Sequence, residues 1–316
     1  MFFKSLFWQG VNNLVKIFLE LFVFNKKIRR ILKGNWAKFY LRKYVKYGIR
    51  NQISLPNITQ EFPESDTDKI IWQYWESKDN SVPPLVQACL NSVERYKGNH
   101  KRILLTPDNV KNYVNIPQIF WDLKEKGRIK TAFFSDILRT CLLIQHGGIW
   151  IDATVLLTEE LPSYITNADL FVFQNDLKID LDGLNMASYF ISSKKDNKIL
   201  KDTLSALVQY WRENNFLVNY FTFLHTFTMV TQATKENIEL YKKVPFFNFL
   251  PVQQFQGELL TKFSEERWEE IKKISGIHKL THKQSVLTKE KNIDIRGTFY
   301  EYIINEFCGI NSTNIE

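Results

Sequence analysis

Residues 135–155 read SDILRTCLLIQHGGIWIDATV, and this stretch contains a complete change of backbone structure. The apolar pattern predicts a helix over roughly 129–146. Gly147-Gly148 then ends the helix and allows a sharp turn, after which residues 149–152 form a short strand. The stretch therefore predicts a helix–turn–strand unit.

The charged residues of this unit stand at defined places. Asp136 and Arg139 are three residues apart and share one face of an apolar helix, where charges are costly unless paired or used. The strand delivers Asp152 to its carboxyl end, and the small Thr154 beyond it leaves room for a ligand. Carboxylates and a guanidinium suit the hydroxyls and phosphates of a sugar nucleotide. The alternative is an internal Asp136–Arg139 salt bridge with Asp152 as a turn cap, and these patterns leave both open.

Short apolar runs alternate with helical patterns along the rest of the chain. We expect strands at 69–75, 101–106, 170–174 and 188–192, and helices at 84–96, 196–212, 220–231 and 265–274. This alternation predicts an α/β fold whose sheet is parallel at its start, with ligands at the carboxyl ends of the strands. The polar residues 51–68 are expected to be a linker.

The first 50 residues differ in charge from the rest. They carry twelve Lys or Arg and one acid, Glu20, a net charge of +11 in a chain whose total is +8. Polar side chains interrupt residues 1–24, so we expect neither a cleavable signal nor a transmembrane span, which needs about 20 mostly apolar residues. Large apolar side chains recur instead on one helical face, at Phe7, Val11, Leu14, Phe18 and Leu21.

An amphipathic helix followed by basic and aromatic residues is typical of a segment that lies on an anionic membrane. A helical hairpin packed on the main domain is one alternative, and nucleic-acid binding is another. The apolar face favours the membrane, because nucleic acid requires the charges but not that face.

Cysteine usage bears on the compartment. Cys89, Cys141 and Cys308 are scattered and form no CxxC pair, which argues against a disulfide framework and indicates a reducing environment. Cys141 lies in the apolar helix and is expected to be a core thiol.

The motif of the opening stretch resembles that of a known group of enzymes. Ser135-Asp136-Ile137-Leu138-Arg139, followed by Gly147-Gly148-Ile149-Trp150-Ile151-Asp152, is similar to the core of the glycosyltransferases with a sugar-binding DXD motif. That group includes initiating mannosyltransferases, capsular polysaccharide synthesis proteins and clostridial glucosylating toxins, and the capsular branch is the most similar. The resemblance covers about residues 69–283 and implies a GT-A type, Rossmann-like mixed sheet with flanking helices and retention of anomeric configuration. We expect this domain to span residues 69–290 and a C-terminal tail to follow at 291–316.

The resemblance also implies roles for individual residues. Asp136 and Arg139 would hold the donor sugar, and Asp152 would contact the ribose or a metal. The expected donor-binding residues are Trp72 (beside the nucleotide base), Ser135, Trp150, Thr154, Lys279 and Lys283.

One position departs from the group's pattern: Thr154 replaces the second Asp of the motif. A Mn²⁺ or Mg²⁺ ion is therefore an open expectation. Asp152, His278 and His282 are the candidate ligands, since imidazole favours Mn²⁺-type metals. Lys279 or Lys283, in the same late segment, is expected to neutralise the leaving diphosphate, unless this is only an exposed loop.

The sequence thus predicts a hexosyltransferase that uses a UDP- or GDP-linked sugar and a glycan or lipid-linked glycan acceptor, as in capsule synthesis. We expect it on the cytoplasmic face of a membrane, held peripherally through residues 1–50, with no nucleic-acid partner. Asn185 and Ser188 are candidates for the acceptor side, while His146 and His225 are expected to be structural. The alternatives are a degenerate sugar-nucleotide or glycan-binding protein and a peripheral membrane scaffold.

Overall fold

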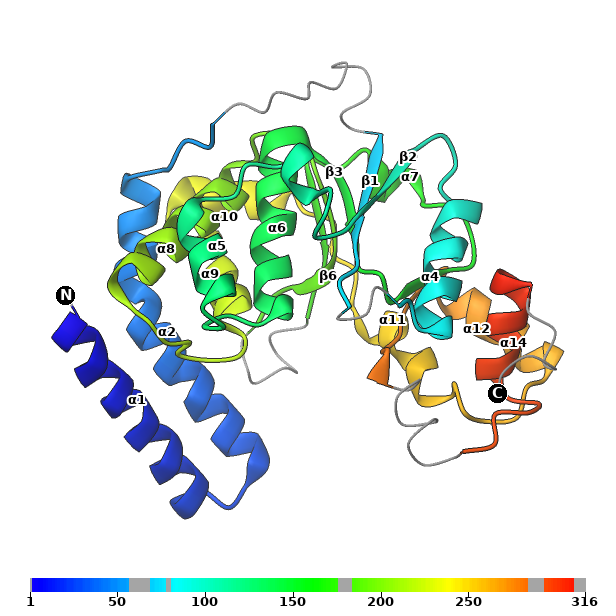
Figure 1. Cartoon of the computed structure of the whole chain (residues 1–316), viewed down its shortest axis with the longest axis horizontal. Helices are drawn as coiled ribbons and strands as arrows, with labels where there is room; N and C mark the ends of the chain where they lie inside the picture. The colour runs from blue at the N-terminus through cyan, green and yellow to red at the C-terminus, as the bar shows by residue number, and fades with distance from the viewer. Residues whose placement is uncertain (1, 57–68, 78–80, 176–183, 284–292, 310–316) are drawn as a thin grey trace.

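A five-stranded mixed sheet forms the centre of the molecule (Figure 1). The computed structural model describes residues 2–56, 69–77, 81–175, 184–283 and 293–309. The strands run in the order β2-β1-β3-β6-β5, with β1 parallel to β2 and β3, and with β6 antiparallel to β3 and β5. Their bounds are β1 Ile70–Tyr74, β2 Lys101–Leu105, β3 Gly148–Ile151, β5 Leu170–Phe173 and β6 Ala187–Ser193. The predicted α/β fold with a sheet that is parallel at its start is confirmed.

Helices cover both faces of this sheet, and a two-stranded antiparallel ribbon, β4 (Val155–Leu157) with β7 (Ile277–Lys279), lies beside it. In Figure 1, α5, α6, α8 and α9 lie on one side of the sheet, and α4, α12 and α14 on the other. The helices are α4 Pro84–Arg95, α5 Gln118–Glu125, α6 Thr131–His146, α7 Ser163–Thr166, α8 Lys198–Glu213, α9 Thr222–Thr231, α10 Lys235–Lys242, α11 Leu250–Gln254, α12 Glu265–Ile274 and α14 Phe299–Cys308, with 3₁₀ turns at η1 Val110–Asn112 and η2 Phe255–Gly257.

Side-chain alternation along the strands divides the core into two parts. Trp72 and Trp150 are register partners and belong to the cluster under α6 and α8. Ile71 and Ile149 point the other way, into a second cluster. Strands buried on both faces read as nearly continuous apolar runs, which is why β1 and β3 are apolar at almost every position. Cys141 is a fully buried thiol of the first cluster, as predicted.

The C-terminal region differs from the predicted tail at 291–316. Phe299–Cys308 forms α14, which packs against α4, and Phe299 and Ile303 are buried. Its side-chain cap, Thr298, and its left-handed terminal Gly309 are ordinary helix boundaries. The helix completes the apolar layer that α4 and α12 begin. Residues 284–290, placed in the catalytic domain by sequence, lie outside the described residues.

The N-terminal module is a pair of antiparallel helices, α1 (Phe2–Phe22) and α2 (Lys26–Arg50) (Figure 1). Helix α2 packs on α8 and α9, and its Tyr40 and Tyr44 are buried against them. Helix α1 turns small polar residues inward instead: Ser5 bonds Asn215, and Asn12 accepts from the indole of Trp36.

Leu19 of α1 is buried, but most of the large apolar side chains of this helix face outward. Phe3, Phe7, Leu14, Phe18, Leu21 and Phe22 are all more than half exposed. Among the residues that the structure describes, no helix has the length and apolarity to cross a bilayer. The packed-hairpin hypothesis therefore describes α2, whereas α1 keeps a largely exposed apolar face.

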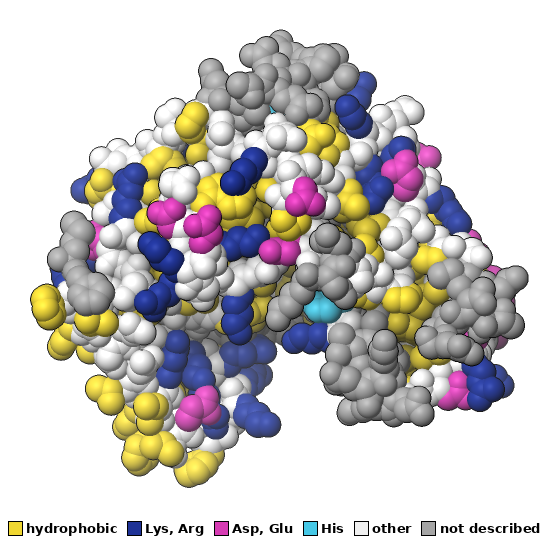
Figure 2. All heavy atoms as spheres, in the orientation of Figure 1, with side chains coloured by type: hydrophobic (Ala, Val, Ile, Leu, Met, Phe, Trp, Pro, Cys, Tyr) yellow, Lys and Arg dark blue, Asp and Glu magenta, His cyan; other side chains and the backbone are white. Residues whose placement is uncertain are grey.

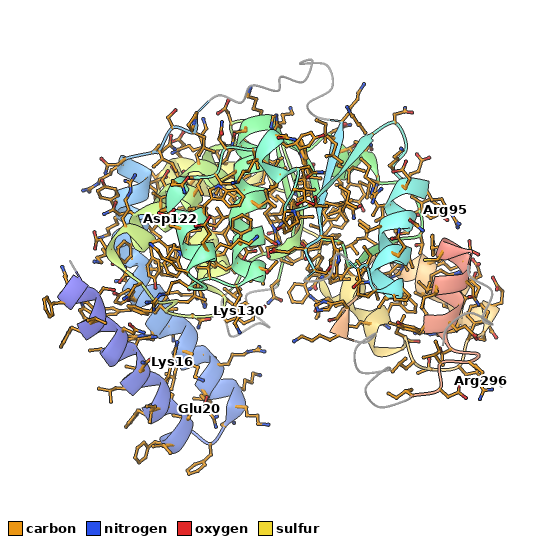
Figure 3. All side chains as sticks on the ribbon, in the orientation of Figure 1. Lys16, Glu20, Arg95, Asp122, Lys130 and Arg296 are labelled. Atoms are coloured by element: carbon orange, nitrogen blue, oxygen red, sulfur yellow. The ribbon has the colours of Figure 1, made fainter. Side chains whose placement is uncertain are left out.

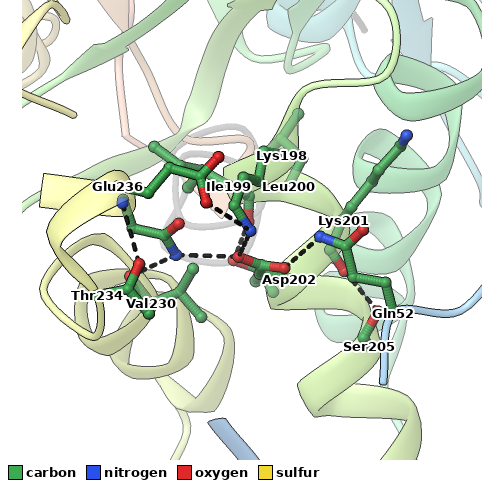
Figure 4. Close-up of polar contacts among 12 residues, drawn as sticks. Gln52, Lys198, Ile199, Leu200, Lys201, Asp202, Ser205, Val230, Thr234 and Glu236 are labelled. Atoms are coloured by element: carbon green, nitrogen blue, oxygen red, sulfur yellow. Dashed lines mark hydrogen bonds and ion pairs between the residues drawn. The ribbon is translucent and has the colours of Figure 1, made fainter. Parts of the chain in front are cut away.

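The end of the N-terminal module is fixed by a buried carboxylate (Figure 4). Asp202 of α8 has no exposed surface, and it accepts hydrogen bonds from Gln52 Nε2 at 2.5 Å and Asn237 Nδ2 at 2.9 Å. Lys198 Nζ, at 3.1 Å, supplies the compensating charge. The predicted linker at 51–68 is thus docked on the body at its start, and residues 57–68 lie outside the described residues.

Close packing of α2 on α8 gives a testable result. A Cβ built at Gly48 would lie 2.5 Å from the backbone nitrogen of Ala206, so Gly48→Ala should lower the free energy of unfolding by about 1–3 kcal/mol. The matched control is Gly10→Ala in α1, where a Cβ meets nothing within 4 Å, and the better helix former should raise that free energy by roughly 0.5–1 kcal/mol. Urea unfolding measures both, and equal effects would contradict the packing argument.

Candidate active site

The helix–turn–strand unit predicted by the opening motif is present. Helix α6 ends at Gly147, whose φ of 73° lies in the left-handed region, and Gly148 has a φ of 93°. Residues with a Cβ seldom adopt such angles, so the two glycines let the chain pass directly from α6 into β3. Because β3 runs back along α6 after this turn, the exposed amino-terminal end of α6 lies beside the carboxyl end of β3.

Asp152, at the end of β3, is the centre of a charged cluster. Arg139 Nη2 lies 3.1 Å from Asp152 Oδ1, and Arg139 Nη1 lies 2.9 Å from Asp136 Oδ1. Trp150 Nε1 donates to Asp152 Oδ1 at 2.8 Å. The guanidinium is buried, its centre lies 4.9 Å from the centre of the Trp150 ring, and its Nε atom has no partner among the described residues. The three motif charges predicted to act together are therefore in contact.

The β4–β7 ribbon adds a fourth charge. Val155 pairs with Lys279, which brings that side chain back to the start of β4. Lys279 Nζ lies 3.3 Å from Asp152 Oδ2 and donates to the hydroxyl of Thr154. Two carboxylates and two cations thus form a neutral cluster at the end of β3.

Burial changes the acidity of one carboxylate. It raises the pKa of Asp136 to about 6, and the negative charge of Asp152 acts in the same direction. Arg139 and the Ser188 hydroxyl oppose this shift, because both stabilise the charged form. A perturbed carboxylate beside a charged partner is a frequent property of functional sites.

Ser188, predicted for the acceptor side, is part of this cluster. Its hydroxyl bonds Asp136, and its carbonyl accepts from Arg139 Nη1 at 2.6 Å. Asn185, predicted for the same side, is not. Its amide is buried and bonds Thr228 and Thr231 of α9, so it holds the approach to β6 in place.

The prediction for Trp72 is wrong. Trp72 has no exposed surface, and its indole donates to the carbonyl of Gly147 at 2.9 Å, so it is a core residue that cannot stack on a base. Trp75, three residues on, is partly exposed beyond the end of β1, and its ring centre lies 5.8 Å from that of His282. The nearly continuous apolar run of β1 could have indicated that Trp72 is a core residue. Trp75 is partly exposed because β1 ends at Tyr74.

His278 is also misplaced by the sequence prediction. It is 1% exposed and lies between the rings of Phe255 and Trp268, on the opposite side of β7 from Lys279. Burial lowers its pKa to about 4. Strand alternation therefore removes His278 from the reach of Asp152.

The remaining predicted residues differ in their surroundings. Ser135 is partly exposed at the end of α6, and Thr154 is buried under Lys279. Trp150 is buried, so it orients Asp152 and does not face a ligand.

His282 and Lys283 are exposed beyond β7. The expected structural histidines, His146 and His225, are buried. Among the described residues, no group of three or more His, Cys, Asp or Glu side chains is placed to hold a metal.

The raised pKa of Asp136 predicts a pH dependence of activity. Below about 6 the carboxyl is protonated, so it no longer pairs with Arg139 or accepts from a hydroxyl in its charged form. We expect kcat/KM for transfer to fall as the pH drops through this value, because kcat/KM reports ionisations of the free enzyme. The Asp136→Asn variant should be weakly active and show no step there. A flat wild-type profile between about pH 5 and 8 would exclude Asp136 as an essential charged group.

Comparison with known proteins adds independent information. The family model for capsular polysaccharide synthesis proteins matches residues 9–303. The O-glycosyltransferase braB of Annulohypoxylon truncatum is 26% identical over 162 residues, which cover 46% of this chain and 38% of that protein. The solved PaToxG glycosyltransferase has a TM-score of 0.37 and 15% identity, over 78% of this chain and 95% of that one.

Proposed function

The chain belongs to the capsular polysaccharide synthesis protein family and carries a glycosyltransferase region, and on this premise we propose that it is a nucleotide-sugar-dependent hexosyltransferase. It transfers a hexose from a UDP- or GDP-sugar, with retention, to a hydroxyl of a growing, lipid-linked surface polysaccharide. The GT-A type of fold is part of this proposal. Because the match covers 38% of the length of braB, the substrates of braB are not assigned to this chain.

The four-charge cluster at the end of β3 is the observation that carries the proposal. Asp136 and Arg139 are partners in the free protein, and both are suited to sugar hydroxyls once a donor enters. Lys279 lies on the far side of Asp152 from Arg139, where it meets the departing diphosphate. Preorganised charges of this kind stabilise charge as it develops in a transition state.

The proposed step is a direct exchange at the anomeric carbon. The bond from this carbon to the diphosphate oxygen breaks, and a bond to the acceptor hydroxyl oxygen forms on the same face. The hydroxyl proton passes to the departing phosphate oxygen. Lys279 stabilises the negative charge that the leaving diphosphate gains.

A divalent metal does not fit this set of residues well. A cation at Asp152 would compete with Arg139 at 3.1 Å and Lys279 at 3.3 Å for the same carboxylate. The Thr154 hydroxyl, in the place of the motif's second Asp, already accepts from Lys279. We therefore assign the neutralising role to the Lys279 ammonium, and no step of the mechanism passes through a metal.

Chelation should accordingly have little effect on transfer. We expect EDTA to lower the rate by less than about threefold, because a lysine already supplies the positive charge that a metal would otherwise provide. The measurement is the initial rate with and without EDTA, followed by Mn²⁺ addition. A loss greater than about tenfold that Mn²⁺ restores would place a metal at Asp152 and overturn this assignment.

The membrane part of the proposal depends on the hairpin. The outward apolar face of α1 and the basic excess of residues 1–50 together suit an anionic bilayer surface. Figure 2 shows hydrophobic side chains gathered at the outer end of the hairpin and Lys and Arg side chains on its flank. Placement on the cytoplasmic face would confine the enzyme and a lipid-linked acceptor to one plane.

A donor screen tests the function. Purified full-length protein is incubated with a panel of UDP- and GDP-sugars, with the metal varied, and products are followed by mass spectrometry. We expect hydrolysis or transfer from at least one donor, and loss of both in Arg139→Ala. Absence of turnover with every nucleotide sugar would contradict the proposal, and donor binding without turnover would favour the degenerate binding protein.

A further inference from the structure

A cavity of about 340 Å³ lies between the N-terminal hairpin and the body, apart from the charged cluster. Its walls come from α1, α2, the segment before α9, α9 itself and the residue Leu184. This volume is at the lower end of the range for small-molecule sites. In Figure 2, Lys and Arg side chains gather on the side of the hairpin that faces the hollow between it and the rest of the molecule.

Positive side chains converge on this cavity. Lys16 of α1 lines it, as do Arg30 and Lys33 of α2. Among the described residues, Lys16 Nζ makes one long hydrogen bond, 3.5 Å, to the carbonyl of Leu217. Figure 3 labels Lys16 between the two helices of the hairpin. Burial lowers the pKa of Lys16, and the charge of Lys33 adds to this effect. The one acid of the hairpin, Glu20, pairs with both Lys33 and Arg29. An anion in the cavity would lie close to the side chains of Lys16 and Lys33, whose positive charges act on each other.

A buried histidine in the wall supplies a second, independent feature. His225 is 2% exposed, lines the cavity, and its Nδ1 atom has no hydrogen-bond partner among the described residues. Burial lowers its pKa to about 4, so the ring is neutral at physiological pH. Buried ring nitrogens normally have partners, so the unpaired Nδ1 makes the His225 ring sensitive to changes in the cavity wall to which it belongs.

The cavity is connected to the charged cluster through one short piece of chain. Leu184 lines the cavity, and Ser188, four residues later, bonds Asp136. Four residues span at most about 15 Å between Cα atoms. A group held in the cavity is therefore within a few sugar lengths of the transfer site.

We propose that this cavity binds the phosphate of the lipid that carries the acceptor glycan, with Lys16, Arg30 and Lys33 as its counter-charges. The inference rests on the proposed function for the identity of the lipid as acceptor. The converging cations suit a phosphate, and the indole of Trp36 and the ring of Tyr220 line the same cavity. Helix α1, which supplies Lys16 to the cavity wall, also exposes apolar side chains on its outer face, and these suit the chain of a lipid. The cavity would hold the phosphate end of the acceptor, while the other end reaches the transfer site at Asp136 and Asp152.

Binding of farnesyl phosphate to the full-length protein tests the site. Calorimetry below the critical micelle concentration compares it with farnesol, which lacks the phosphate, and with inorganic phosphate, which lacks the lipid. We expect farnesyl phosphate to bind at least about tenfold more tightly than either, and Lys16→Gln/Arg30→Gln to weaken it by about tenfold or more. The control, Lys26→Gln/Lys27→Gln, removes the same charge from exposed positions of α2 outside the cavity and should change affinity by less than about twofold.

Each other outcome contradicts the proposal. Equal weakening in the control variant would indicate general electrostatic attraction. Equal binding of farnesol would indicate that the apolar face of α1 alone binds the lipid, and equal binding of inorganic phosphate would indicate a site for free phosphate. If the Lys16 variant fails to fold, the nuclear magnetic resonance signals of His225 in the wild-type protein decide, since farnesyl phosphate should shift them and an unchanged ring would overturn the site. Neither readout requires a donor or turnover, so failure of the transferase proposal is distinguishable from failure of this one.

Discussion

Lys279→Met should lower kcat for sugar transfer by about 10²–10³-fold with a smaller change in KM, because the ammonium interacts most strongly with charge that develops on the leaving diphosphate. Methionine keeps a stem of similar length but removes the charge that lies 3.3 Å from Asp152. The variant also leaves Asp152 with Arg139 as its remaining charged partner among the described residues. The measurement is a steady-state comparison of kcat and KM with the donor identified by the screen.

Lys283→Met is the matched control for this result. Lys283 is exposed four residues beyond Lys279, so the same substitution there should change kcat by less than about twofold. Thermal unfolding of both variants checks that the fold is retained. Equal losses in the two variants, or a loss confined to KM in Lys279→Met, would show that Lys279 does not act on the transition state.

The two lysines also show where sequence reasoning reached its limit. From the sequence, Lys279, Lys283, His278 and His282 are equivalent candidates on one late segment. The pairing of Val155 with Lys279 distinguishes them, because it turns one face of a three-residue strand toward Asp152 and buries His278 on the other. Such a short strand has no periodicity of its own to detect, so its orientation follows only from the tertiary contact.

The motif itself was predictable in detail. An apolar helix with charges three apart, a double glycine and a strand ending in Asp152 all follow from local rules of periodicity and backbone freedom, and all are present. The base-stacking role given to Trp72 failed because β1 is buried on both faces, so Trp72 lies in the core. Helix α14 lies in the segment that the sequence predicts to be a tail. Its apolar side chains cover α4, and this tertiary contact is not visible in the local sequence pattern.

The orientation of α1 is a further property that composition cannot supply. The sequence predicts an apolar stripe at Phe7, Phe18 and Leu21, and such a stripe normally packs against a core. In the structure Ser5 and Asn12 face the body, and the stripe faces out. An outward stripe on a helix followed by a basic helix suits the proposed contact with a membrane surface.

Phe18→Ser/Leu21→Ser should therefore reduce binding to anionic vesicles by about 10²-fold, since each large apolar side chain that enters a membrane contributes about 1.5 kcal/mol. These side chains are 58% and 61% exposed, so their loss should leave the thermal unfolding midpoint nearly unchanged. Vesicle sedimentation at several salt concentrations measures the partition coefficient. The apolar contribution should persist when salt screens the Lys and Arg side chains.

The control removes two similarly exposed apolar side chains from the body of the protein. Phe246→Ser/Leu250→Ser starts from exposed fractions of 60% and 53%, and it should leave vesicle binding unchanged because these residues lie outside the hairpin. If both double variants lost binding equally, the membrane contact would be a general property of exposed apolar surface. If only the α1 variant loses it, the outward stripe is the membrane contact, and the basic flank of α2 adds the charge that selects an anionic surface.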